Sequence, residues 1–257
     1  MSINFHDEQN KRSYTTRLAD QSWIDFIKNH IDVNGKQIAD LGCGGGIYSK
    51  ALAMLGAKVT AVDFSEEMLK GATENCKGLA NITFLQGDAY HTNLASTSFD
   101  IILQRALIHH LDDLDACFKE ANRLLKKNGL LIIQDRTPED CLLPGDPHHI
   151  RGYFFEQFPK LESIESSRRY PSQKVVNALE SNGFIITTEE KLWEARRNYQ
   201  YFEQLSHDLL QRTGRSILHE LTNDELSMLI QTIQNKFNPR TAIIEKDRWT
   251  IWIGIKK

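Results

Sequence analysis

The chain has 257 residues, of which 40% are hydrophobic and 25% are charged. This composition is typical of a globular protein and excludes disordered, collagen-like and coiled-coil proteins. With 31 basic and 34 acidic residues the net charge is −3, which disfavours a dedicated binder of duplex DNA because such proteins carry a basic excess. The length suits one large domain, so we expect residues 1–257 to form a single domain with insertions.

The sequence indicates a cytoplasmic protein. It contains no apolar run long enough to span a membrane, and Met1–Arg12 lacks the apolar region of a signal peptide. The cysteines are far apart and form no C-x-x-C pair, so we interpret them as reduced thiols rather than as disulfide or zinc ligands. They are Cys43, Cys76, Cys117 and Cys141. The oligomeric state cannot be predicted from these features.

Short apolar runs alternate with helical patterns between residues 36 and 135. Ile47–Leu55 has helical spacing, Ser65 is a suitable helix N-cap, and Asp112 or Asp113 caps a helix that Gly129 should stop. Strands separated by helices pair in parallel and are covered on both faces. The predicted strands are Gln37–Leu41, Lys58–Asp63, Asn81–Leu85, Phe99–Leu103 and Leu130–Gln134.

The alternation continues in the second half of the chain but is interrupted twice. A helix from Ser172 to Leu179 precedes a strand at Phe184–Thr188, and Arg248–Ile255 has the period of a half-buried, antiparallel strand. Pro138–Tyr170 and the helical stretch Glu194–Pro239, which contains the capping box Thr222-x-x-Glu225, do not fit the alternation. We therefore expect an N-terminal helical segment (1–30), a core (31–136) that binds a cofactor, and insertions (137–171 and 194–246) that form a cap or lid.

The most informative segment is D-L-G-C-G-G-G at 40–46, between the first strand and its helix. Glycines allow positive φ and a close approach to a ligand, and ligands bind at the carboxyl ends of parallel strands. Asp63 ends the next strand, 21 residues after Gly42, where an acid that holds ribose hydroxyls is expected. The pattern therefore predicts a nucleotide-like cofactor.

The loop does not match the sequence patterns of dinucleotide or triphosphate sites. The fingerprint G-x-G-x-x-G/A fails at Ile47, and the P-loop motif is absent. Asp40 stands immediately before the loop, where it would repel a pyrophosphate but attract a ligand that carries an ammonium and a sulfonium group.

Five segments resemble the class I S-adenosylmethionine-dependent methyltransferases, in particular the small-molecule methyltransferase group. The resemblance covers about residues 36–136. The segments are D-L-G-C-G-G-G (40–46), V-D-F-S (62–65), Q-G-D-A (86–89), F-D-I-I-L-Q-R-A-L-I-H-H-L (99–111) and L-L-K-K-N-G-L-L-I-I (124–133).

The resemblance implies an α/β fold, a doubly wound Rossmann-like sheet of seven strands in the order 3-2-1-4-5-7-6 with strand 7 antiparallel, and S-adenosyl-L-methionine as the cofactor. It implies that Gly42 and Gly44 contact the methionine part, Asp63 the ribose, Asp88 the adenine amino group, Ala89 an adenine ring nitrogen and Gln104 the ammonium group.

Four more residues belong to the predicted cofactor site. They are Asp40, Cys43, Phe64 and Met68. An ordinary core position is the alternative for Phe64 and Met68, and Cys43 is expected to pack rather than to act as a nucleophile.

On the acceptor side, His109 is the candidate general base, because it follows the fourth strand at the carboxyl edge. A metal site at His109-His110-Leu-Asp112 is disfavoured, since such iron sites lie on antiparallel sheets, and we predict no metal. Arg105 and Arg136 follow neighbouring strands and should converge with His109. Further candidates are Tyr14, Arg17, Arg151 and Tyr153, for which solvated or surface-turn positions are the alternatives. The pairs Arg168-Arg169 and Arg196-Arg197 are expected to be solvated.

We therefore predict an enzyme that transfers a methyl group to a small-molecule acceptor, for which two arginines and a histidine suggest an anionic group. We expect no membrane association and no nucleic-acid partner. The remaining alternatives are an NAD-dependent oxidoreductase, a non-catalytic cofactor-binding module and an RNA methyltransferase, which would need a local basic face.

Overall fold

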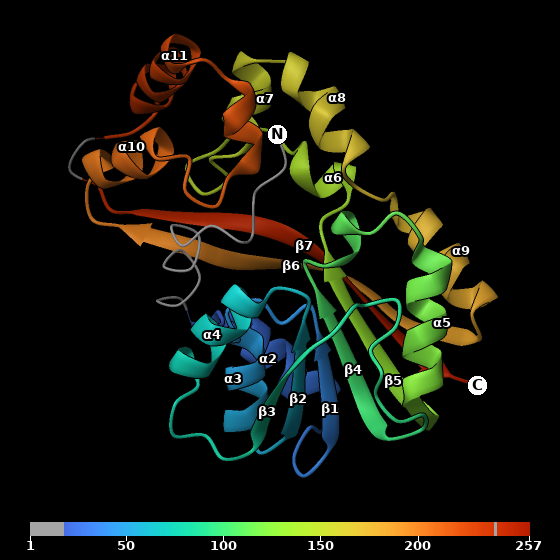
Figure 1. Cartoon of the computed structure of the whole chain (residues 1–257). Coiled ribbons are helices and arrows are strands. Elements are labelled where there is room, and N and C mark those ends of the chain that lie inside the picture. Colours follow the sequence, from blue (N-terminus) through green and yellow to red (C-terminus); the bar gives the residue numbers. More distant parts are fainter. Residues whose placement is uncertain (1–17, 239–240) are drawn as a thin grey trace. The chain divides into compact units, whose positions relative to one another are not determined.

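The computed structural model of the chain describes residues 18–238 and 241–257, and its centre is a seven-stranded sheet (Figure 1). The strand order is β3-β2-β1-β4-β5-β7-β6, as predicted. The pairs β1–β2, β1–β4, β2–β3 and β4–β5 are parallel, whereas β7 runs antiparallel to β5. The strands are β1 (Gln37–Leu41), β2 (Lys58–Asp63), β3 (Ile82–Gln86), β4 (Phe99–Arg105), β5 (Leu125–Asp135), β6 (Phe184–Tyr199) and β7 (Ile243–Lys256).

The helices begin at the capping residues that the sequence offers. The Ser65 hydroxyl accepts a hydrogen bond from the Met68 N–H, and the carboxylate of Asp113, not that of Asp112, accepts from the Ala116 N–H at 2.9 Å. The helices are α2 (Gln21–His30), α3 (Ile47–Met54), α4 (Glu66–Asn75), α5 (Leu114–Leu124), α6 (Pro138–Cys141), α7 (Gly152–Gln157), α8 (Lys160–Ser167), α9 (Ser172–Ser181), α10 (Phe202–Leu210) and α11 (Asn223–Gln234), with 3₁₀ turns η1 (Ile108–His110) and η2 (Ser216–Glu220).

The prediction that Gly129 stops the helix is wrong, because α5 ends at Leu124 and β5 begins at Leu125. Phe99 pairs with Leu125 but Ile101 pairs with Leu130, so β5 carries extra residues opposite β4. Asn128 has a φ of 60° within this irregular segment. A polar segment that the sequence suggests as a helix end is therefore a bulge at the start of a strand.

The last two strands are longer than predicted. β6 continues to Tyr199, so residues 194–199 are strand and not helix. Over residues 249–254 β7 is buried on both faces rather than on one, because Trp252 is buried like its neighbours Ile251 and Ile253. The Trp252 indole N–H donates to the Ser172 hydroxyl at the start of α9.

The chain divides into two compact units, each with an apolar core of its own. The core unit comprises the described residues 18–135, 171–192 and 250–257, and its apolar cluster includes Trp23, Leu103 and Ile132. The second unit comprises residues 136–170, 193–238 and 241–249, and its cluster includes Phe154, Leu205 and Leu229. No helix in the described ranges is both long and apolar enough to cross a membrane. The function of the second unit as a cap or lid stays a prediction.

Candidate cofactor and acceptor site

The glycine loop connects β1 to α3 and has a conformation that side chains disfavour. The φ angles of Gly42, Gly44 and Gly46 are 73°, 52° and 74°. A Cβ atom on Gly42 would lie 2.8 Å from a methyl carbon of Leu107, which follows β4. The loop therefore requires glycine for its backbone and, at Gly42, for its packing.

Asp63, at the end of β2, holds this loop in place. One carboxylate oxygen accepts the Gly44 N–H at 2.8 Å and the other accepts the Ser65 N–H at 2.9 Å. Burial raises the pKa of Asp63, while these backbone hydrogen bonds oppose the increase. Asp63 thus links the loop to the start of α4, and its contact with a ribose stays a prediction.

Asp40 is buried beside the loop. It is 2% exposed and accepts a hydrogen bond from the Ser49 hydroxyl at 2.5 Å. The pKa of Asp40 is raised to about 6. Burial is the main cause and the nearby Asp63 adds to it, whereas the Ser49 hydrogen bond and the Arg105 charge lower the pKa. A cationic ligand group at this position would stabilise the ionised carboxylate.

The end of β4 bends sharply. Ala106 has a φ of 51° and donates its N–H to the Gln134 carbonyl at 2.8 Å. Arg105, just before the bend, stacks over the Tyr48 ring with its guanidinium carbon 3.9 Å from the ring centre. Gln104 is buried and donates its amide N–H to the Cys117 thiol on α5. The side-chain Oε1 atom of Gln104 is buried without a hydrogen-bond partner among the described residues, and contact of Gln104 with the cofactor's ammonium group stays a prediction.

The residues predicted to lie near the adenine differ in their exposure. Phe64 is 54% exposed directly after Asp63, so it is not a core residue, whereas Met68 is buried beside Gly44. Asp88 is exposed and accepts the Tyr90 N–H at 2.7 Å. Cys43 is buried, and its burial raises the pKa of the thiol, as expected for a packing residue.

His109 is held by an acid that sequence reasoning missed. Asp135 ends β5, is 1% exposed and lies 2.8 Å and 2.9 Å from the His109 Nδ1 atom through its two oxygens. It also accepts the His109 backbone N–H at 3.2 Å. Asp135 contacts the His109 ring at Nδ1, so Nε2 is the ring nitrogen that Asp135 does not contact. The available signal was an acid at the end of the strand that neighbours β4.

Three of the other predicted acceptor residues lie in the second unit. Arg136, Arg151 and Tyr153 belong to the second unit, and Tyr14 and Arg17 lie outside the described residues. The convergence of Arg136 with Arg105 and His109 therefore stays a prediction. Arg151 and Tyr153 are 5% and 6% exposed, so the surface-turn alternative is wrong for both.

Two of the arginines expected to be solvated are buried in ion pairs. Arg169 binds the Glu165 carboxylate at 2.9 Å, and Arg196 binds Glu245 at 3.1 Å. Glu165 is four residues from Arg169 and Glu245 is 49 residues from Arg196. These carboxylates neutralise the two arginine charges, which solvent was expected to screen. Arg197 is exposed, in line with the expectation.

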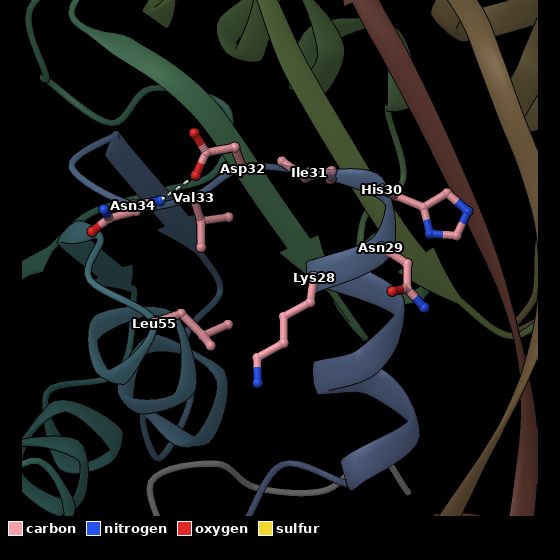
Figure 2. Close-up of a pocket in the computed structure, with 8 residues that line it drawn as sticks. All are labelled: Lys28, Asn29, His30, Ile31, Asp32, Val33, Asn34 and Leu55. Carbon is pink, nitrogen blue, oxygen red and sulfur yellow. Dashed lines mark hydrogen bonds between the residues drawn. The ribbon is translucent and has the colours of Figure 1, made fainter.

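A hollow of about 460 Å³ lies elsewhere in the core unit (Figure 2). It is lined by the end of α2, the turn that precedes β1 and Leu55. These residues lie at the amino end of β1, whereas the glycine loop follows its carboxyl end. The hollow is therefore not part of the cofactor site. In the described part of the chain, no group of three or more histidine, cysteine or acidic side chains could hold a metal ion.

Comparisons with known proteins agree with this geometry. Residues 39–133 match the family described as "Methyltransferase domain". The curated "Ubiquinone biosynthesis O-methyltransferase" of Xanthomonas oryzae is 29% identical over 146 residues, which cover 51% of this chain and 61% of that protein. The protein of the same name from Coxiella burnetii is 35% identical over 110 residues, covering 42% of this chain and 47% of its own length. The chain thus spans between about half and three fifths of these relatives.

The whole fold also has counterparts among solved structures. A putative methyltransferase from an antibiotic biosynthesis pathway of Anabaena variabilis has a TM-score of 0.69 at 22% identity, and the match covers 92% of this chain and 98% of that one. The match over residues 39–133, the sheet order and the glycine loop thus agree with the resemblance to the class I S-adenosylmethionine-dependent methyltransferases and support S-adenosyl-L-methionine as the cofactor.

Proposed function

We propose that the chain transfers a methyl group from S-adenosyl-L-methionine to an oxygen of a small, anionic molecule. The observation that carries the proposal is the glycine loop clamped by Asp63 next to buried Asp40, within residues that match a methyltransferase domain. The cofactor's chemistry fits the residues present. Glycines allow the positive φ angles of the loop, and a buried acid with a raised pKa gains from a neighbouring cation.

The protein's own residues would supply positioning and proton transfer. The bound cofactor supplies an activated methyl group, so the chain must hold the acceptor in line with it and exclude water. The His109 Nε2 atom would accept the proton of an acceptor hydroxyl, while Asp135 orients the ring and stabilises its charged form. An oxygen acceptor is also supported by the curated relatives, which are named as O-methyltransferases.

The proposal is tested by cofactor binding and turnover. S-adenosylhomocysteine should raise the melting temperature and NAD should not. Asp63→Ala should weaken S-adenosylhomocysteine binding by about 1.5–3 kcal/mol, the scale of a hydrogen bond to a charged group. Unchanged affinity in titration calorimetry would remove Asp63 from the cofactor site.

The other function classes predict different results. A larger stabilisation by NAD than by S-adenosylhomocysteine would indicate an oxidoreductase. Cofactor binding without methyl transfer to any member of a broad acceptor panel would indicate a non-catalytic module. Salt-dependent binding of tRNA would indicate an RNA methyltransferase.

A further inference from the structure

Arg151 is a buried arginine whose hydrogen-bonding capacity is mostly unused. A guanidinium carries five N–H donors, and a buried donor without a partner is costly. In the part of the chain that the structure describes, Arg151 donates one hydrogen bond, from Nε to Asp247 at 3.3 Å, and its Nη1 atom lies 3.7 Å from Glu165. Neither carboxylate serves Arg151 alone. Arg136 contacts the same Asp247 oxygen at 3.4 Å, and Arg169 contacts the same Glu165 oxygen at 2.9 Å.

Another buried arginine of the second unit is hydrogen-bonded more completely. Arg215 is 1% exposed and donates from both terminal nitrogens, to Asp208, Glu245, the Tyr199 hydroxyl and the Thr213 carbonyl, although its Nε atom has no partner among the described residues. The pKa of Arg215 is raised, and its acidic neighbours oppose the effect of burial. The pKa of Arg151 is lowered by burial and by the charge of Arg136. Both terminal nitrogens of Arg215 are thus engaged, whereas among the described residues the Arg151 side chain donates only from Nε.

His149 provides a second, independent sign at the same place. It is 1% exposed, and its Nδ1 lies 3.2 Å from the Pro144 carbonyl. A carbonyl can only accept, so Nδ1 carries the hydrogen and Nε2 is an acceptor. Nε2 is buried and has no partner among the described residues. Burial lowers the pKa of His149, which favours this neutral form, and the charges of Asp247 and Arg151 act on the ring.

We propose that Arg151 and His149 form a subsite of the second unit that binds a small molecule with an anionic group, a proposal that takes its class of molecule from the proposed function. A carboxylate or a phosphate would accept two parallel N–H bonds from the Arg151 guanidinium, and a hydroxyl or N–H of the same molecule would donate to His149 Nε2. The molecule bound there is therefore a small one with an anionic oxygen group and a donor beside it.

The test uses the full chain and two matched pairs of probes. Benzoate is compared with benzamide, and phenyl phosphate with phenol, by thermal shift and titration calorimetry. We expect one anion or both to bind and their uncharged analogues not to bind. The better of the two anions identifies the anionic group as a carboxylate or a phosphate. No binding preference for either anion would overturn the proposal.

Variants locate the site. Arg151→Gln should weaken anion binding roughly tenfold or more, because a charge-assisted pair is lost. Arg197→Gln removes an exposed arginine of the same unit and should leave anion binding unchanged. If Arg151→Gln does not fold, two other variants keep the test open. Arg151→Lys retains the charge but loses the two-pronged geometry, and His149→Asn retains the Nδ1 donor but loses Nε2. Anion binding that is unaffected in the folded variants would place the anion elsewhere.

The readouts separate this subsite from the proposed function. The shift in melting temperature caused by S-adenosylhomocysteine reports on the core unit and should be the same in wild type and Arg151→Gln. If S-adenosylhomocysteine does not raise the melting temperature of the wild type, the proposed methyl transfer is overturned. If it does, but neither anion binds better than its uncharged analogue, only the subsite is overturned.

Discussion

At the scale of single residues, Asp40 shows how a buried acid lowers the stability of the free protein. Its pKa rises from 3.8 to about 6 on folding because the carboxyl is buried. The folded state then binds the proton more tightly than the unfolded state. The free energy of unfolding therefore falls as pH rises from about 4 to about 6, by roughly 3 kcal/mol, and is constant above that range.

Asp40→Asn should therefore stabilise the free protein and weaken cofactor binding. Asparagine can still accept the Ser49 hydrogen bond but carries no charge, so we expect the free energy of unfolding at neutral pH to increase by about 1–3 kcal/mol. The gain should vanish near pH 4, and affinity for S-adenosylhomocysteine should fall because its ammonium group loses an ionised partner.

Asp100→Asn is the matched control for Asp40→Asn. The pKa of Asp100 is lowered, where Lys126 and the Gln37 N–H oppose burial, so neutralising it should not stabilise the protein. Denaturant unfolding across this pH range gives the comparison. A destabilised Asp40→Asn protein at neutral pH would contradict the interpretation.

The second prediction at the scale of residues concerns Asp135. Asp135→Asn removes the charge that orients and stabilises the His109 ring, so kcat should fall roughly 10²-fold or more while cofactor affinity is unchanged. His109→Ala should give a comparable loss and should flatten the pH dependence of kcat. If Asp135 were only structural, the melting temperature would fall but the pH profile of the remaining activity would match wild type.

At the scale of elements, the buried parallel strands could be predicted and the polar strands could not. β1 and β2 have the predicted bounds, because a strand covered on both faces is a continuous apolar run with clear ends. The second half of β6, residues 192–199, mixes charged residues with half-buried ones. The surface of a helix has a similar pattern, so the sequence did not indicate a strand there. The start of β5 is hidden by the polar residues of its bulge.

The prediction at the scale of elements concerns Gly44 in the glycine loop, whose positive φ the sequence suggested. Gly44 has positive φ, and an added Cβ would lie 3.3 Å from the end of Met68. Gly44→Val should abolish S-adenosylhomocysteine binding, because a β-branched residue is strained there and its side chain occupies the space expected for the ligand. The circular dichroism spectrum should stay that of a folded protein.

Gly78→Val is a suitable control for Gly44→Val. Gly78 also has positive φ, but an added Cβ meets nothing within 4 Å, so this variant carries the backbone strain without the steric effect. Normal binding by Gly44→Val would show that the loop does not approach the cofactor.

At the scale of the whole molecule, long-range ion pairs set the limit of sequence reasoning. Asp135 and His109 are 26 residues apart, and Arg215 and Glu245 are 30 apart. Only the fold brings such side chains together, so the glycine loop was predicted from a local motif but the acid that holds the candidate base was not. For the same reason the burial of Arg196 could not be foreseen.

The second unit carries the last prediction, which concerns a lid. Residues 194–239 include α10 and α11, and the apolar faces of both helices lie in that unit's own core. Amides within these helices should therefore exchange slowly with solvent even in the free protein, because they open only when that core opens. Protease sensitivity is expected in the turn that follows α10, at residues 211–214, because this part of the connection is exposed or half-buried.

If the unit acts as a lid, S-adenosylhomocysteine together with the tighter-binding anion probe should slow both cleavage and exchange there. Hydrogen-exchange mass spectrometry with and without the two ligands measures this. The apolar cluster of the core unit, around Ile132, serves as the internal reference. Equal rates in both conditions, with ligand binding confirmed, would make this segment a permanent structural part of the protein.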